Sequence, residues 1–379
     1  MNAATQASLL AAAAGVAAAV YRRLRSRGAG SAGRCTPVAR DVPTGEAGWE
    51  SAPAETAAAA TTDPGVPARS RGGLLPGTAS IGGPRAGLLV PLSRLVAGLA
   101  VPAAGAGLWP GRSAPTRAFR THRGQTVQLY GRGLYRNDTV FAAAGQRATD
   151  AVVLGVAVPL LVAATCLHRR GSLAGHLLLL GTLAAFVYLY GSMALGTVVY
   201  NELFLLYVAL FSASLWAFAI AFATVDKQDL AARLAGAPRR RPAALMLASG
   251  TVTAGVWAVP LAAAVRRGGV PERLDSYSTP VTQALDLAVI APAALFAGSR
   301  ILRGDPLGYL VASSLLVVEV MLAPLIAAQT AGQLAAGIRF PPGQVAGPIA
   351  GFVGLALAAA STLAGVLRRI ARVPTPAAA

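Results

Sequence analysis

Residues 173–196 read LAGHLLLLGTLAAFVYLYGSMALG, a run without a single Asp, Glu, Lys or Arg. A helix needs about 20 apolar residues to cross the hydrocarbon core of a membrane, so this run predicts a membrane-spanning helix. Comparable runs recur at 87–109, 149–167, 202–224, 243–265, 281–299, 307–328 and 345–367. The first of these is the weakest, because Pro91, Arg94 and Pro102 interrupt it. Residues 86–370 are therefore predicted to form an all-α, polytopic transmembrane bundle of about eight helices.

The composition agrees with a chain whose main solvent is lipid. Only 13% of its 379 residues are charged and 55% are hydrophobic, whereas about a quarter of the residues of a soluble domain are charged. The formal net charge of +18 comes from basic residues that mostly lie between apolar runs or near the N-terminus. That placement is typical of membrane loops and of contacts with anionic lipid. We therefore expect the lipid bilayer as a partner and no nucleic acid, and protein partners and small-molecule ligands stay open.

The two ends of the chain have a different character. Residues 1–85 are mostly rich in Ala, Gly, Pro, Ser, Thr and Arg and lack periodicity, which predicts a disordered low-complexity tail. A start codon assigned too far upstream would explain this segment equally well. The apolar run Ser8–Val20 is too short to span comfortably, and if it did span, it would move the N-terminus outside. Residues 371–379 are expected to form a second, short disordered tail.

Loop arginines indicate an orientation. Clusters at 168–170, 239–241, 300–303 and 368–369 alternate with outer joints at 197–201 and 329–344, which contain only Arg339. Arginines at 266–280 and 110–147 weaken this contrast. We expect a plasma membrane protein with both termini in the cytoplasm and residues 110–147 as an extracytoplasmic loop. Within that loop, residues 126–130 and 134–135 flank Gly131-Arg132-Gly133, which predicts a small hairpin.

Three stretches of the chain are similar to segments of known proteins: RGQTVQLYGRGLYRNDT at 123–139, YNELFLLYVALF at 200–211 and QALDL at 283–287. Together they resemble a family of uncharacterised multi-spanning bacterial membrane proteins of actinobacterial type, over about residues 88–370. Many relatives would have Tyr where this chain has Asn137. The resemblance implies the same membrane topology with the arginine-rich loop outside, and it implies no activity, cofactor or catalytic residue.

Two carboxyl groups are the main candidates for an intramembrane polar site, because a charge at the centre of a membrane helix costs about 2.5–3.5 kcal/mol on insertion scales. Glu319 lies near the middle of its run, and Asp286 lies within a turn of Gln283 near the outer end of another. For Glu319 the sharper hypothesis is a proton or cation site. The alternative is a neutral carboxyl that joins two helices by hydrogen bonds. For Asp286 the alternatives are an outward-opening polar pocket and a partly hydrated surface patch.

The outer surface supplies the remaining candidates. Glu202 follows Asn201 in a short joint, where Asn201 capping the next helix would be a sufficient explanation for both residues. Tyr188, Tyr190 and Ser192 precede this joint, and tyrosines there are more often interface anchors. Arg123, Arg132 and Arg136 of the outer loop could hold an anion such as a phosphate.

No catalytic residue can be assigned from these patterns. The chain has no defensible nucleophile triad, P-loop or dinucleotide fingerprint, and its histidines lack metal-ligand spacing. We expect no metal and no cofactor, and the sequence favours a protein that is not an enzyme. Transporter-like or channel-like function ranks first. The alternatives are a membrane-embedded enzyme acting on a lipid-linked substrate at the outer face and a non-catalytic envelope interaction protein.

Overall fold

The computed structural model describes residues 84–111, 114–121, 123–196, 201–271, 274, 277, 279–340 and 342–372. Within these residues, eight helices are long and apolar enough to cross a membrane. The predicted all-α transmembrane bundle of about eight helices is thereby confirmed. Of the tails predicted at residues 1–85 and 371–379, residues 1–83 and 373–379 lie outside the described residues, and residues 84–85 are helical.

The spans are formed by ten α-helices and two π-helical segments. They are α2 (Pro84–Leu108), α3 (Val140–Val152), η1 (Val153–Ala157), α4 (Val158–Arg169), α5 (Leu173–Gly196), α6 (Phe204–Ala223), α8 (Arg240–Arg266), α9 (Val281–Leu285), η2 (Asp286–Ile290), α10 (Ala291–Leu302), α11 (Pro306–Ala335) and α12 (Pro342–Arg372). The segments α3, η1 and α4 form one continuous span, as do α9, η2 and α10. Outside the spans lie the strands β1 (Arg117–Arg120) and β2 (Thr126–Leu129) and the short helix α7 (Lys227–Leu234).

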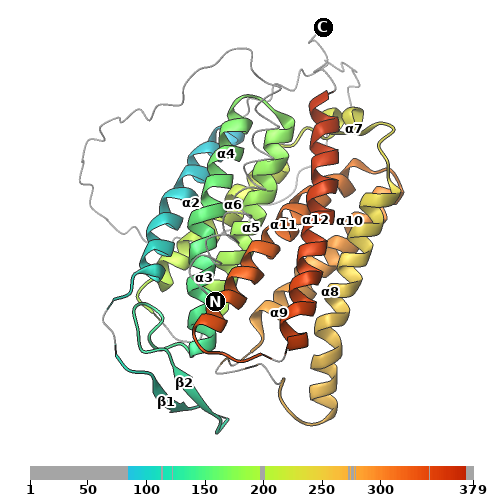
Figure 1. Cartoon of the computed structure of the whole chain (residues 1–379). Coiled ribbons are helices and arrows are strands. Elements are labelled where there is room, and N and C mark those ends of the chain that lie inside the picture. The colour runs from blue at the N-terminus through green and yellow to red at the C-terminus, as the bar shows by residue number, and fades with distance from the viewer. Residues whose placement is uncertain are drawn as a thin grey trace, which may run out of the picture.

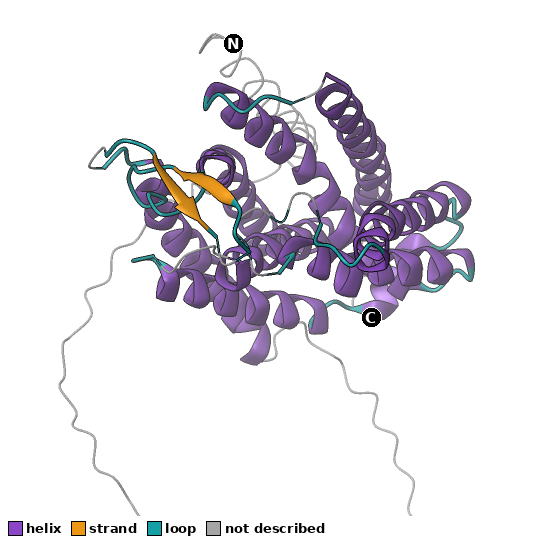
Figure 2. Ribbon diagram, turned by 90° about the horizontal axis from the view of Figure 1, so that it is seen from below, coloured by secondary structure: helices purple, strands orange, loops and turns teal. Residues whose placement is uncertain are grey.

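The two ends of the bundle differ (Figure 1). The antiparallel pair β1–β2 lies beyond one end, which we call the hairpin end, and α7 lies at the other, the α7 end. Figure 2 looks onto the hairpin end, where the two strands lie in front of the helices. Pro84 of α2 and Arg372 of α12 both lie at the α7 end, because an even number of spans separates them.

Helices α5 and α11 form the centre of the bundle. They are the two spans with most of their residues buried, and they pack against each other. Gly181 permits this contact, since a Cβ at that position would lie 2.7 Å from Cβ of Val317 and 2.9 Å from the carbonyl oxygen of Ser313. Small residues allow membrane helices to approach closely, so that van der Waals contacts hold them together without any hydrophobic driving force.

Each π-helical segment precedes a proline. Pro159 and Pro292 have no N–H, so they cannot bond to the carbonyls of Gly155 and Ala288 one turn earlier, which lie within η1 and η2. The local widening to π geometry accommodates this loss, and such segments occur frequently at functional sites. Asp286 is the first residue of η2.

The hairpin differs from the predicted one. Strand β2 coincides with the predicted 126–130 segment, but its partner is the upstream strand β1, with Arg117 opposite Leu129, rather than residues 134–135. Gly131 and Gly133 have φ of 75° and 57°, and a side chain at either position would strike backbone oxygens of the segment 109–115. The two glycines therefore let the chain pack against that segment. The chain also turns back on itself after β2, where Leu129 forms an antiparallel bridge with Thr139 and the N–H of Gly131 donates to the carbonyl oxygen of Arg136.

Two element boundaries also differ from expectation. Helix α3 begins at Val140, so residues 140–147 of the predicted outer loop are helical. Thr139 defines this start, because its hydroxyl accepts a hydrogen bond from the backbone N–H of Ala142 at 3.2 Å. At the other end of the chain, α12 continues through Arg372, two residues into the predicted C-terminal tail.

Candidate functional site

Glu319 lies inside the bundle on α11 and is 4% exposed. The hydroxyl of Ser249 on α8 donates a hydrogen bond to its Oε1 atom at 2.5 Å. Its Oε2 atom is buried and has no hydrogen-bond partner among the described residues. An unpartnered buried oxygen of this kind is costly, and it is available to a proton or a small cation.

Asp286 accepts hydrogen bonds from two neighbouring helices. The hydroxyl of Tyr188 on α5 donates to Oδ1, and the indole N–H of Trp257 on α8 donates to Oδ2, each at 2.8 Å. Gln283 lies one turn earlier on α9 and is half-buried. Tyr188, for which the sequence favours an interface anchor, is therefore a direct partner of this carboxyl group.

Helix α8 links the two predicted carboxyl groups. Its two donors, Ser249 and Trp257, lie eight residues apart, which corresponds to about 12 Å along a helix axis. Glu319 and Asp286 belong to different helices, yet both accept hydrogen bonds from α8. The structure therefore brings the two carboxyls against one helix at two depths.

Another carboxyl group inside the bundle, Asp150 on α3, was missed by the sequence analysis. It is 2% exposed and accepts a hydrogen bond from the hydroxyl of Tyr135 at 2.8 Å. The Tyr135 hydroxyl lies 3.4 Å from that of Tyr207, and the Tyr207 ring lies 6.3 Å from that of Tyr190. We call Asp150, Tyr135, Tyr190 and Tyr207 the tyrosine cluster.

The position of Asp150 in the predicted span concealed its burial. The predicted span began at residue 149, which placed Asp150 at a membrane boundary where a carboxylate needs no explanation. Because the helix begins at Val140, Asp150 lies ten residues inside it, or about 15 Å. Aspartate near the apparent end of an apolar run is therefore a candidate whenever the preceding residues can extend the helix.

The end of α2 closes over the tyrosine cluster. Gly107 leaves room for the Asp150 carboxylate, which a side chain at that position would displace. Arg147 donates to the carbonyl oxygens of Gly107 and Leu108, both at 2.9 Å, and so satisfies the C-terminal carbonyls of α2. Burial, and next the nearby Asp150, raises the pKa of Tyr135 well above its usual value. The Tyr135 hydroxyl therefore stays protonated and remains a donor.

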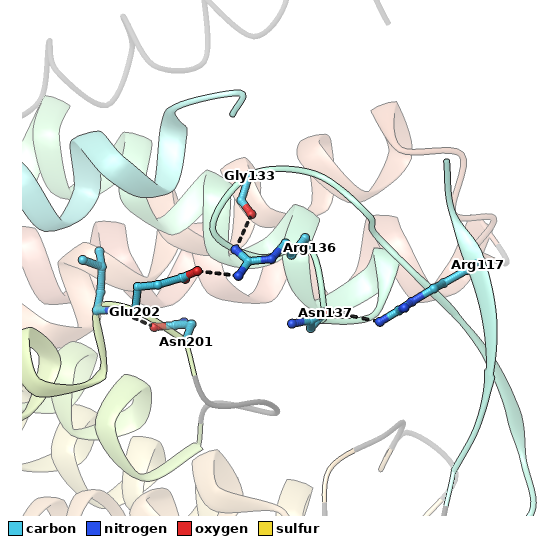
Figure 3. Close-up of polar contacts among 7 residues, drawn as sticks. Arg117, Gly133, Arg136, Asn137, Asn201 and Glu202 are labelled. Atoms are coloured by element: carbon cyan, nitrogen blue, oxygen red, sulfur yellow. Dashed lines mark hydrogen bonds and ion pairs between the residues drawn. The ribbon is translucent and has the colours of Figure 1, made fainter. Parts of the chain in front are cut away.

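Arg136 and Glu202 form an ion pair on the exposed surface of the hairpin end (Figure 3). Arg136 also donates to the carbonyl oxygen of Gly133 at 3.4 Å. The hydrogen bond from Arg136 lowers the pKa of Glu202, and the same bond raises the pKa of Arg136. Asn201 accepts a hydrogen bond from the backbone N–H of Leu203 at 3.0 Å, in the turn directly before α6.

The other predicted outer arginines lie apart from this pair. Arg123 donates to the carbonyl oxygen of Tyr277 at 2.9 Å. Arg132 lines a cavity between α3 and α11. The outer candidates therefore occupy separate places, and Asp286 contacts Tyr188 and Trp257 instead of any of these arginines.

The fold defines an integral membrane protein of the helical-bundle class, with carboxyl groups held between its helices. No family model, curated protein or solved structure matches the chain. The resemblance of residues 123–139, 200–211 and 283–287 to uncharacterised bacterial membrane proteins stays a prediction.

Proposed function

We propose that this protein is a transporter or channel-like protein of the plasma membrane, and that Glu319 and Asp286 bind the proton or cation involved. The observation that supports this proposal best is the buried, unpartnered Oε2 atom of Glu319 near the middle of a membrane span. Ionisable groups at that depth are rare and mark ion pathways and proton relays.

Helix α8 is the element that would respond to binding. It carries Val252, Val256 and Val259 on an exposed face, with more than half of each side chain accessible. Towards the bundle it donates to Glu319 and Asp286. A carboxyl group accepts such bonds more strongly when ionised, because bonds to a charged acceptor are about twice as strong. Binding or release of a proton would therefore change how tightly α8 is held against α11 and η2.

The orientation belongs to the same proposal. Arg169, Arg170, Arg300 and Arg303 lie in or beside short joints at the α7 end, and Arg266, Arg267 and Arg339 lie in or beside joints at the hairpin end. The α7 end also carries Lys227, Arg233 and Arg239 between α6 and α8. Positive residues in short loops favour the cytoplasmic side. We infer that the α7 end, with both chain termini, faces the cytoplasm and that the hairpin end faces outwards.

The two alternatives have less support. An enzyme that acts on a lipid-linked substrate would need Asp286, Glu202 and the outer arginines to converge, but their contacts separate them into different clusters. A scaffold without a polar site would leave Glu319, Asp286 and Asp150 as purely structural hydrogen-bond acceptors.

The test is the accessibility of single cysteines at positions 319, 286 and 202. Cys35 and Cys166 are replaced first, and an impermeant thiol reagent is added to intact cells. Val317, which is 1% exposed and packs towards Gly181 on α5, provides the buried control position on the same helix. The proposal expects labelling at 202, 286 and 319 and none at 317.

Labelling at 202 and 286 without labelling at 319 from either side of the membrane would contradict a pathway through Glu319. A second readout is proton flux into proteoliposomes, compared between the wild type and Glu319→Gln. Gln keeps the hydrogen bond with Ser249 but cannot release a proton, so a flux unchanged by this substitution would also contradict the proposal.

A further inference from the structure

A cavity of about 620 Å³ lies between α3 and α11 in the half of the bundle nearest the hairpin end. Its floor consists of small apolar side chains from the facing stripes of the two helices, among them Ala144, Ala148, Ala151, Ala328 and Ala331. Along α11 the lining extends from Pro324 to Ala335, which corresponds to about 16 Å of helix. The floor therefore has the shape and the apolar surface that suit an extended hydrocarbon chain.

Part of the lining of this cavity is polar and positive. Residues Thr116, Tyr130 and Arg132 from the hairpin region and Arg147 from α3 contribute to its lining. No carboxylate lines it among the described residues. Arg147 is occupied by carbonyl oxygens at the end of α2. Arg132 is exposed and forms no hydrogen bond or ion pair with any described residue, so its guanidinium is the group available for an anion.

We propose that this cavity binds one anionic membrane lipid, with its phosphate at Arg132 and one acyl chain along the alanine floor. Arginine recognises phosphate through paired N–H donors, and its hydrogen bonds to a charged acceptor are strong. The volume lies within the range of about 300–1,000 Å³ that is usual for ligand sites. The site shares no residue with the Glu319 and Asp286 contacts, so it stands whether or not the protein transports an ion.

The test measures lipid binding to the purified full-length chain by native mass spectrometry. The probes are dioleoylphosphatidylglycerol, dioleoylphosphatidylcholine and inorganic phosphate. Arg132→Gln removes the phosphate contact, and Arg120→Gln is its matched control, because Arg120 is also an exposed arginine of the hairpin but does not line the cavity. Ala328→Phe fills the floor, and Ala258→Phe, on the exposed face of α8, is its matched control.

We expect one phosphatidylglycerol per chain, bound in preference to phosphatidylcholine, with inorganic phosphate bound weakly. Arg132→Gln should weaken phosphatidylglycerol binding by about tenfold or more, as expected for one charge-assisted hydrogen bond. Ala328→Phe should weaken both lipids, while neither control changes them. Because position 132 is exposed, Arg132→Gln tests the proposal even if Ala328→Phe impairs folding.

Three outcomes would overturn the proposal. Equal phosphatidylglycerol binding by Arg132→Gln and Arg120→Gln would show that Arg132 does not contact the lipid phosphate. Equal effects of Ala328→Phe and Ala258→Phe on lipid binding would show that the acyl chain does not lie in the cavity. Inorganic phosphate bound as tightly as the lipid would indicate a surface anion site without a chain-binding floor.

Discussion

Tyr188 and Tyr190 lie two residues apart on α5, and their side chains belong to different polar clusters. The hydroxyl of Tyr188 donates to Asp286 at 2.8 Å, whereas the ring of Tyr190 lies 6.3 Å from the ring of Tyr207 in the tyrosine cluster. Two residues correspond to about 200° around a helix, so the two side chains leave α5 on opposite faces. Helix α5, which is largely buried, therefore stands between two carboxyl groups that belong to different parts of the bundle.

The hydroxyls of these tyrosines are expected to contribute unequally to stability. Tyr188→Phe leaves Asp286 with only Trp257 as a donor, and loss of such a bond in a membrane helix costs about 0.6–1.7 kcal/mol. The Tyr190 hydroxyl is buried and has no hydrogen-bond partner among the described residues. Tyr190→Phe should therefore be neutral or stabilising. Thermal unfolding in detergent compares the two variants, and an equal loss in both would contradict the assignment of partners.

The bond between Tyr135 and Asp150 is expected to appear as an energetic coupling. We predict a coupling of about 0.6–1.7 kcal/mol in the double-mutant cycle of Tyr135→Phe and Asp150→Ala. The matched cycle pairs Tyr135→Phe with Asp286→Ala, in the other cluster across α5. Its effects should add within about 0.5 kcal/mol, because distant sites without shared partners are independent. Additivity in both cycles would rule out the predicted coupling.

Gly181 is expected to tolerate no side chain. Gly181→Ala would force α5 away from Val317 and Ser313 of α11, and overpacking of this kind costs about 1–3 kcal/mol. Gly98→Ala is the control, because nothing lies within 4 Å of a Cβ built at that position on α2. It should be neutral or stabilising by up to about 1 kcal/mol, since Ala favours the helix. Equal thermal stability of the two variants would show that α5 and α11 are packed less closely.

The ion pair of Arg136 and Glu202 is expected to make a small, acid-sensitive contribution to stability. Because the pKa of Glu202 is lower in the folded protein than its ordinary value of about 4.3, the pair adds stability at neutral pH. This contribution is lost as the pH falls through the lowered pKa. Both side chains are largely exposed, so it amounts to at most about 1 kcal/mol.

The measurement is the stability difference between the wild type and Glu202→Gln at pH 7 and at progressively lower pH. The difference should be largest at pH 7 and should vanish once Glu202 is protonated in both the folded and the unfolded states. In an Arg136→Gln background, the pH dependence of this difference should be much smaller. A difference that grows on acidification would reverse the predicted sign.

The number and approximate positions of the spans follow from the residues alone. Apolar runs such as 173–196 and 307–328 must become helices in lipid, because no water is present there to satisfy an open backbone. The same reasoning identifies Glu319 and Asp286 as unusual, since a carboxyl group inside such a run is costly wherever the helix packs.

The partners of those carboxyl groups required the tertiary structure. Nothing in the local pattern relates Ser249 to Glu319, or Tyr188 and Trp257 to Asp286, because each contact joins helices far apart in the chain. Asp150 became visible as a buried group only once Thr139 placed the start of α3 and Tyr135 folded back onto it. Hydrophobicity depends on each residue and its neighbours in sequence, whereas hydrogen-bond partners depend on which helix faces meet, and packing across the whole bundle decides that.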